Sequence, residues 1–150
     1  DDLIGKLKKK KNFLGGYFYK RQLVFGLADL RMHTLTDFSN PIDLQELWYG
    51  VEKEVLEMEN DIKLYPFATF GHLVGNYDSG YYGYLLSQTY ASHIFHKMFG
   101  DDNVLNPEVG MHYRKSLLEP GSRYDSFDQL TKYLGEQPRG DYFVNELLNQ

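Results

Sequence analysis

Apolar residues recur at the spacing of an α-helix along most of the chain, and this periodicity constrains the fold more than any other feature of the sequence. The clearest case lies between Ile42 and Met58, with apolar positions at Leu44, Leu47, Trp48, Val51, Val55 and Met58. This spacing places the apolar side chains on one face of a helix. Asn40 and Pro41 precede the segment as an N-cap residue and a proline at the first helical position. The pattern therefore predicts an amphipathic helix from Ile42 to Met58.

A second helical pattern runs from Leu14 to Ala28, nearer the start of the chain. Its glycines, Gly15 and Gly16, indicate a junction with a short lysine-rich helix before it. The lysine run extends from Lys6 to Lys11, and as a helix it would keep Leu3, Ile4 and Leu7 on one side. We favour this reading, in which the lysines are solvated, over a targeting signal or a site for polyanions.

Start signals predict further helices in the second half of the chain. Asn106 followed by Pro107 repeats the signal of an N-cap and a first-turn proline. Ser126 with Gln129 resembles a capping box, and a last helix follows Pro138.

The segment from Tyr81 to Phe99 is apolar around most of its circumference, which is typical of a helix buried between others. No part of the sequence alternates apolar and polar residues with hairpin turns, so nothing predicts strands. We therefore predict an all-α fold. A chain of 150 residues is long enough for one domain with a proper core.

Composition excludes several classes of function. The formal net charge of -5 argues against a general nucleic-acid binder, which normally has a basic face. Cysteine is absent, which excludes disulfides and thiolate metal sites and agrees with a reducing compartment. No apolar run approaches a membrane span, and the start is too acidic for a secretory signal. We expect a soluble protein of the cytoplasm, with the mitochondrion as the alternative, and no membrane partner.

Aromatic residues make up 16% of the chain, with 13 Tyr and 10 Phe, which favours a peptide cleft or a large contact surface. They are dense in Phe70–Ser87, which reads FGHLVGNYDSGYYGYLLS. The glycines of this segment allow conformations closed to other residues, as in a lid over a ligand, and they are Gly71, Gly75, Gly80 and Gly83.

Tyr81 and Tyr84 fall on one face if a helix begins near Gly80. Converging phenol donors suit a developing negative charge or an extended peptide backbone, which makes them candidate ligand-binding residues. The alternative is a purely structural role, because tyrosines at helical spacing more often pack in a core.

The histidines do not predict a metal site. Only His93 and His96 are close enough on a helix to bind one ion, and the residues between them are Ile94 and Phe95. Zinc peptidases instead use histidines at i and i+4 with a glutamate between them. We therefore expect ordinary packing or solvation for this pair. No cysteine nucleophile, phosphate-binding loop or dinucleotide fingerprint is present.

Phe70–Ser87 closely resembles the GHL…GGYD…YYGYLWS segment of the zinc oligopeptidase family that includes thimet oligopeptidase, neurolysin and saccharolysin. The resemblance continues, in the order and spacing of the family, through FHKMF at Phe95–Phe99, NPEVGMHYR at Asn106–Arg114, LEPG at Leu118–Gly121 and LTKYLGEQP at Leu130–Pro138. Upstream, Leu14–Thr34 is similar to the helix that follows the metal site of the family. The whole chain thus resembles the C-terminal part of such an enzyme, a multi-helix subdomain of a zincin-like oligopeptidase.

The resemblance implies metal-assisted hydrolysis of short peptides by the whole enzyme. In the family, a His-Glu-x-x-His helix and a downstream glutamate bind zinc, and all three ligands precede the matched region. We therefore expect no zinc on this chain, no activity of the chain alone, and the missing N-terminal part of the enzyme as a partner.

The matched positions imply roles in substrate binding and transition-state stabilisation. His72 and Tyr77 match the histidine and the loop tyrosine that reach the substrate backbone, while Tyr81 and Tyr84 match helix tyrosines that face the metal-bound carbonyl. Tyr84, together with Tyr77, would donate to the oxyanion. Gly71, Gly75 and Gly80 would give the loop its mobility.

Three positions depart from the family pattern. Asn76 replaces the second glycine of GGYD, although asparagine tolerates positive φ better than most residues. Ser122 replaces the second glycine of PGG, and Leu86 replaces the tryptophan of YLWS.

An alternative function is a non-catalytic helical module that binds peptides or proteins. An isolated fragment of such an enzyme would expose a large apolar patch at the helix of Tyr81–Phe99, so we expect self-association, an exchange of helices between copies, or a companion chain.

Overall fold

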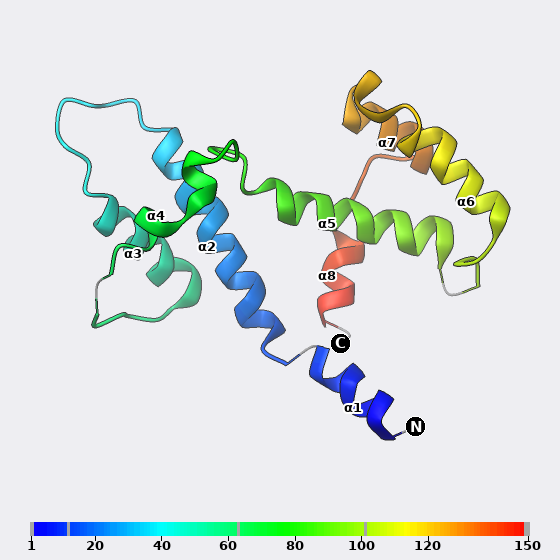
Figure 1. Ribbon diagram of the computed structural model, residues 1–150, viewed down its shortest axis with the longest axis horizontal. Coiled ribbons are helices and arrows are strands. Elements are labelled where there is room, and N and C mark those ends of the chain that lie inside the picture. Colours follow the sequence, from blue (N-terminus) through cyan, green and yellow to red (C-terminus); the bar gives the residue numbers. More distant parts are fainter. Residues whose placement is uncertain (1, 12, 63, 101, 149–150) are drawn as a thin grey trace. The chain divides into compact units, whose positions relative to one another are not determined.

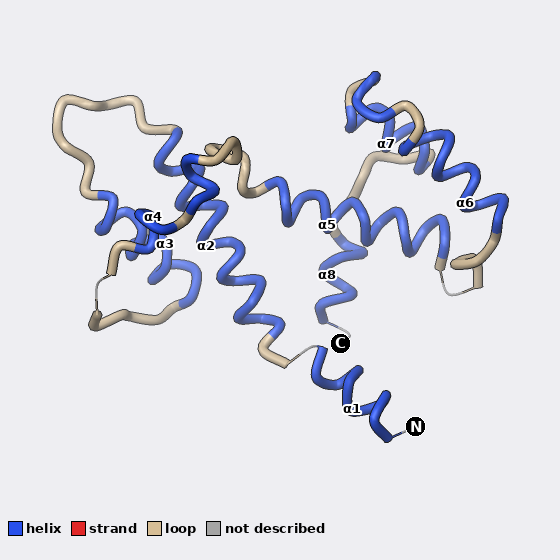
Figure 2. Tube along the Cα trace, in the orientation of Figure 1, coloured by secondary structure: helices blue, strands red, loops and turns tan. Residues whose placement is uncertain are grey.

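The computed structural model describes residues 2–11, 13–62, 64–100 and 102–148 (Figure 1). These residues form helices, turns and loops and contain no strand (Figure 2), which confirms the all-α prediction for this part of the chain. No helix within these ranges combines the length and the apolar character that crossing a bilayer requires. The chain divides into two compact units, residues 1–85 and 86–150.

The first unit is built around two long helices. Its elements are α1 (Asp2–Lys11), α2 (Gly15–His33), α3 (Leu44–Leu56), α4 (Pro66–Thr69) and a 3₁₀ turn at Gly71–Val74. The break between α1 and α2 confirms the predicted junction at the glycines. Leu3, Ile4 and Leu7 of α1 are all exposed.

The core of the first unit lies between α2 and α3. Val24 and Ala28 of α2 pack against Trp48 and Val51 of α3, and these four residues form the buried apolar core cluster of this unit. Phe70 packs against the same cluster from the segment after α4. Burial of these apolar side chains is the main term that holds the two helices together.

The bounds of α3 correct the predicted helix at both ends. The N-cap is Asp43, not Asn40, because the Asp43 carboxylate accepts hydrogen bonds from the backbone N–H groups of Gln45 and Glu46. At the other end, Glu57 takes a left-handed conformation with a φ of 58° and ends the helix. Met58 therefore lies outside the helix and is exposed.

In the second half of the chain, α5 (Gly83–Ile94) continues into a π-helical turn at Phe95–Phe99. The elements that follow are α6 (Pro107–Tyr113), a π-helical turn at Arg114–Leu118, a 3₁₀ turn at Gly121–Arg123, α7 (Ser126–Leu134) and α8 (Asp141–Leu148).

Two of the predicted start signals have different outcomes. The start of α6 is confirmed, since the Asn106 side chain accepts from the backbone N–H of Glu108. The predicted capping box at Ser126 is wrong. Asp125 caps α7 by accepting from the N–H groups of Phe127 and Asp128, and Ser126 is already the first helical residue.

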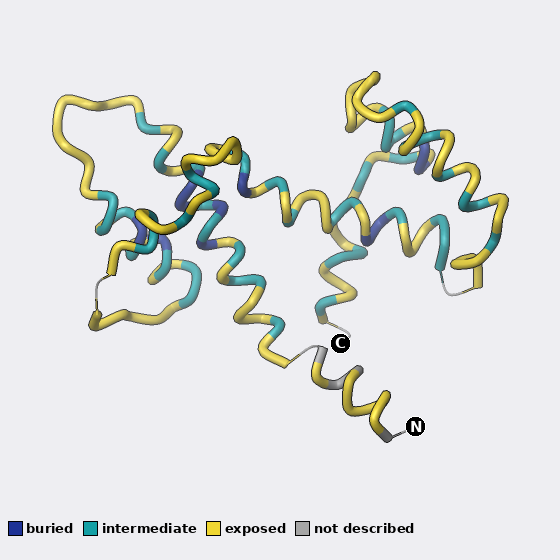
Figure 3. The backbone as a smooth tube through the Cα atoms, viewed as in Figure 1, coloured by how far each residue is buried: buried dark blue, intermediate teal, exposed yellow. Residues whose placement is uncertain are grey.

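The predicted burial of the Tyr81–Phe99 helix is wrong for the described chain. The buried residues of α5 are Ser92 and His93, whereas Tyr82, Leu86 and Phe95 are exposed. Most of the tube at α5 has the colours of intermediate and exposed residues in Figure 3. The apolar pattern is real, but little of the described polypeptide covers it. This exposure agrees with the expectation that such a helix presents an apolar surface.

His93 organises the second unit as a packing residue. The backbone N–H of Arg139 donates to His93 Nδ1 at 3.1 Å, so Nε2 is left to donate to Glu136 Oε1 at 3.3 Å. The imidazole also stacks on Tyr142 of α8, with 4.5 Å between ring centroids. His96 contacts a different carboxylate, Glu146. His93 is 0% exposed, so it is packed as predicted. Among the residues that the structure describes, no group of three or more His, Cys, Asp or Glu could hold a metal ion.

We expect Trp48→Ala to lower the free energy of unfolding by about 3–5 kcal/mol, because it removes a large side chain from the α2–α3 core. Only 3% of Trp48 is exposed, and its ring contacts Phe25 and Phe70. Chemical denaturation of the chain, followed by circular dichroism, measures the change. The matched control is Phe38→Ala at an exposed position, which should change stability by no more than about 0.5 kcal/mol. Equal effects of the two substitutions would contradict this assignment of the core.

Candidate functional site

The structure brings the predicted site residues of the first unit together around one imidazole. His72 lies in the 3₁₀ turn, and its ring centroid is 5.6 Å from that of Tyr77, 5.1 Å from Tyr81 and 5.8 Å from Tyr84. Phe70, which packs on the α2–α3 core, lies 5.0 Å from the same imidazole. The core therefore positions His72, and His72 contacts all three tyrosines edge to face.

Tyr77 and Tyr84 form a half-exposed pair. Their rings are stacked with 5.3 Å between centroids and 17° between planes. The exposed fractions are 47% for Tyr77 and 45% for Tyr84, so both can be reached by a ligand. A hydrogen bond with Tyr77, with further contributions from burial and from the neighbouring phenols, raises the pKa of Tyr84 above its usual value. Tyr84 therefore stays a neutral hydrogen-bond donor throughout the physiological range.

Tyr81 has a different environment from the other two tyrosines. Only 8% of it is exposed, and its hydroxyl donates to Gln22 Oε1 of α2 at 2.8 Å. Its ring lies edge-on to Phe25, with 5.6 Å between centroids. Burial raises the pKa of this phenol. Tyr81 is therefore packed in the core, which was the alternative that the sequence left open for these tyrosines. The exposure of Tyr77 and Tyr84 argues against a core role for them.

A buried carboxylate holds the end of the loop that carries Tyr77. Asp29 of α2 is 0% exposed, and its two oxygens accept from the backbone N–H of Ser79 at 2.8 Å and of Tyr81 at 3.0 Å. His33, one turn later on α2, places its Nδ1 3.0 Å from Asp29 Oδ1. The carboxylate is therefore fully engaged, as a buried charge requires.

The loop backbone differs from the one that its glycines predicted. The residues with positive φ are Asn76, at 67°, and Ser79, at 55°, not Gly71, Gly75 or Gly80. Gly75 is required for a different reason, because a Cβ atom there would lie 2.8 Å from the carbonyl oxygen of Gly71. Asn76 tolerates this conformation better than most residues, as its replacement of a glycine suggested.

The helix start after the loop also differs from the prediction. α5 begins at Gly83 rather than near Gly80, but a turn bridges the two positions, with Gly83 N–H donating to Gly80 O at 3.0 Å. Tyr81 and Tyr84 still come together, since their ring centroids are 5.1 Å apart.

A hollow of about 620 Å³ lies in the first unit beside His72, and its walls include Arg21, Phe70, His72, Gly75, Tyr77 and Tyr81. Neither Asp29 nor Arg21 was predicted as a site residue. The signal for Asp29 was a carboxylate beside the apolar positions Phe25, Ala28 and Met32 of a long helix, with a histidine four residues later.

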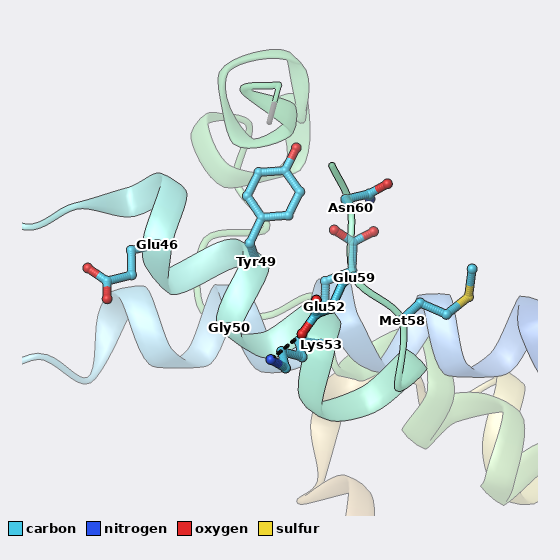
Figure 4. A pocket seen from close by; sticks show the side chains of 8 residues that line it. All are labelled: Glu46, Tyr49, Gly50, Glu52, Lys53, Met58, Glu59 and Asn60. Carbon is cyan, nitrogen blue, oxygen red and sulfur yellow. Dashed lines mark hydrogen bonds and ion pairs between the residues drawn. The ribbon is translucent and has the colours of Figure 1, made fainter. Parts of the chain in front are cut away.

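A second hollow of the first unit, about 330 Å³, lies between α3 and the segment that follows it (Figure 4). Tyr49, Lys53 and Met58 contribute to its wall, and Lys53 forms an ion pair with Glu59 across it, drawn as a dashed line in Figure 4. None of the predicted site residues lines this hollow.

Comparison with known proteins assigns the chain to one group. The model of "Peptidase family M3" matches residues 1–148. Saccharolysin of Saccharomyces cerevisiae is 36% identical over 149 residues, which is 98% of this chain and 21% of that protein. Thimet-like oligopeptidase of Dictyostelium discoideum is 30% identical over 148 residues, 97% of this chain and 21% of that protein. Oligopeptidase A of Escherichia coli is 28% identical over 142 residues, 93% of this chain and 21% of that protein. The chain therefore spans about a fifth of the length of these relatives.

We expect Asp29→Asn to loosen the loop that precedes α5. The amide keeps the shape of the side chain but places a donor against a backbone donor, so at least one charge-assisted hydrogen bond, worth about 1.5–3 kcal/mol, is lost. Hydrogen exchange at the amides of Ser79 and Tyr81 should therefore accelerate. The control is Asp78→Asn, at an exposed carboxylate of the same loop, which should leave both amides protected. Unchanged protection in Asp29→Asn would contradict the role of Asp29.

We also expect Tyr77→Phe to lower the pKa of Tyr84 toward the usual value of about 10. Because the pKa of Tyr84 is raised in the folded protein, Tyr84 keeps its proton at pH values at which the unfolded chain has already lost it. The stabilisation is thus present below about pH 10 and disappears as the pH rises through the folded pKa. Carbon NMR of labelled tyrosine measures the titration. Tyr82→Phe is the control and should leave the pKa of Tyr84 unchanged. An unchanged Tyr84 pKa in Tyr77→Phe would refute the interaction between the Tyr77 and Tyr84 hydroxyls.

Proposed function

The chain belongs to peptidase family M3, and from this premise we propose that it forms the substrate-binding wall of a zinc-dependent oligopeptidase that hydrolyses short peptides. The observation that carries the proposal is the half-exposed, stacked pair of Tyr77 and Tyr84 beside His72. Two of the relatives, thimet-like oligopeptidase and oligopeptidase A, have names that describe the hydrolysis of oligopeptides, and they align over nearly the whole chain.

The tyrosine pair suits stabilisation of negative charge on a peptide carbonyl oxygen. Hydrolysis turns this oxygen into an oxyanion, and preorganised neutral donors lower the energy of that state. In this proposal the Tyr84 hydroxyl, together with that of Tyr77, donates to this oxygen. His72 contacts both rings and thus contributes to substrate binding and to the orientation of the phenols.

Tyr81 supports the site from beneath. Its hydroxyl is engaged by Gln22, while its ring contacts those of His72 and Tyr84. In this proposal Tyr81 borders the substrate and holds the two neighbouring rings in place. Gly71, Gly75 and Gly80 let the backbone of the loop come close to the ligand.

The residues described here do not fit a zinc site of their own, because they include no group of three His, Cys, Asp or Glu at metal-binding distance. We propose that the zinc ligands and the general base of the enzyme lie on polypeptide outside these 150 residues. The chain by itself is then inactive, and its residues bind and orient the peptide and donate hydrogen bonds.

The exposed apolar side chains point to a covered surface in the complete enzyme. Leu86, Phe95, Leu105 and Leu118 of the second unit are exposed large apolar residues. We propose that the N-terminal part of the enzyme covers this surface, and that the isolated chain associates with itself. The lack of cysteine fits the cytoplasm, with the mitochondrion as the alternative.

In the full-length enzyme, we expect Tyr84→Phe to lower kcat by about 100- to 1000-fold, the usual effect of one lost oxyanion donor. Zinc content, measured by atomic absorption, should stay unchanged because Tyr84 is not a ligand. The control is Tyr82→Phe, which removes an exposed phenol from the adjacent position.

Unchanged turnover of Tyr84→Phe would remove Tyr84 from the oxyanion role. A full-length protein that binds peptides without hydrolysing them, and that contains no zinc, would instead support the non-catalytic binding module.

A further inference from the structure

Arg21 of α2 presents a positive charge at a fixed place in the hollow beside His72. Its guanidinium carbon lies 4.9 Å from the centroid of the Phe25 ring, a cation–π distance. Phe25 itself is held by rings on three sides, with centroid distances of 5.8 Å to Trp48, 4.8 Å to Phe70 and 5.6 Å to Tyr81. The ring beneath the guanidinium is thus part of the packed core.

Arg21 differs from the neighbouring cations of the first unit in its partners. Lys20 pairs with Glu57 and Arg31 pairs with Glu54, whereas no carboxylate pairs with Arg21 in the described part of the chain. The walls of the hollow that Arg21 shares with His72 and Tyr77 contain no acidic residue. Asp29, on the same helix, is fully buried and already accepts from the loop.

The charge of Arg21 also acts on the hollow. Burial raises the pKa of Tyr81, and the guanidinium opposes this rise, as a nearby positive charge does. The hollow therefore combines an apolar wall, phenol donors and one unpaired planar cation, an arrangement that favours an anionic group on the ligand.

We propose that Arg21 binds a carboxylate of the peptide substrate, and that this contact selects peptides that carry a negative charge at that position. The inference rests on the proposed function and adds a specificity determinant to it. A guanidinium binds a carboxylate through two parallel N–H···O hydrogen bonds, which an ammonium cannot reproduce. The carboxylate is either the C-terminus of the peptide or an acidic side chain.

The test uses a glutamine-containing peptide in the full-length enzyme and compares its free C-terminal acid, its C-terminal amide, and a set of amides in which each glutamine in turn is replaced by glutamate. We expect the wild type to prefer the matching carboxylate by about 10- to 100-fold in kcat/KM. Arg21→Gln should remove this preference. Arg21→Lys should retain part of it.

Arg31→Gln is the matched control, because it removes the same charge from an exposed site of α2 whose partner is Glu54. It should keep the full preference. Loss of the preference for the free acid alone identifies the C-terminus as the ligand, and loss for the glutamate peptides alone identifies an acidic side chain. A preference that survives in Arg21→Gln overturns the inference but leaves the peptidase function intact.

If the wild type hydrolyses none of the peptides, the proposed function is wrong, and titration calorimetry with the same peptides still decides the inference. Tighter binding of a carboxylate peptide by wild type than by Arg21→Gln supports it, and equal binding overturns it. Thermal unfolding monitors the fold of each variant. If Arg21→Gln does not fold, a reduced preference in Arg21→Lys supports the inference and a full one overturns it.

Discussion

The two hydrogen bonds that Asp29 accepts from the loop backbone are the interaction on which the candidate site depends. A carboxylate with no solvent contact is stable only when its oxygens are satisfied, and here the N–H groups of Ser79 and Tyr81 and the imidazole of His33 satisfy them. Because the buried carboxylate needs these hydrogen bonds, it holds the loop against α2. Because α2 is also one side of the core, the position of the tyrosines follows from the packing of α2 against α3.

A series of aromatic contacts connects the buried core to the exposed tyrosines of the candidate site. Trp48 contacts Phe70, Phe70 contacts His72, and His72 contacts the exposed pair of Tyr77 and Tyr84. Trp48 is buried, Phe70 and His72 are partly buried, and Tyr77 and Tyr84 are exposed. Side chains held in this way lose little conformational entropy on binding, because the packing has already fixed them.

The sequence predicted the helices well because their apolar stripes are local patterns. It failed at ends where two capping residues compete. Asp43 and Asp125 cap α3 and α7 with carboxylates that accept two N–H groups each, although Asn40 and Ser126 also matched the start signal. The site residues His72, Tyr77 and Tyr84 were found through a family motif. Asp29 and Arg21 were missed because their roles arise from contacts with residues far along the chain. Helical periodicity indicates only which residues share one face of a helix and does not predict such contacts.

The conformation of the loop between Gly75 and Tyr81 indicates whether this loop acts as a mobile lid or as a rigid wall. Its beginning is fixed by the close approach of Gly75 to Gly71, and its end is fixed by Asp29. Freedom is therefore confined to the few residues between, of which Tyr77 is one. Asn76 has a positive φ where the family pattern has glycine, and a residue with a side chain has fewer backbone states to lose than glycine when the chain becomes ordered. A short, preorganised loop moves Tyr77 over a small range, which suits the role of oxyanion donor that we propose for it.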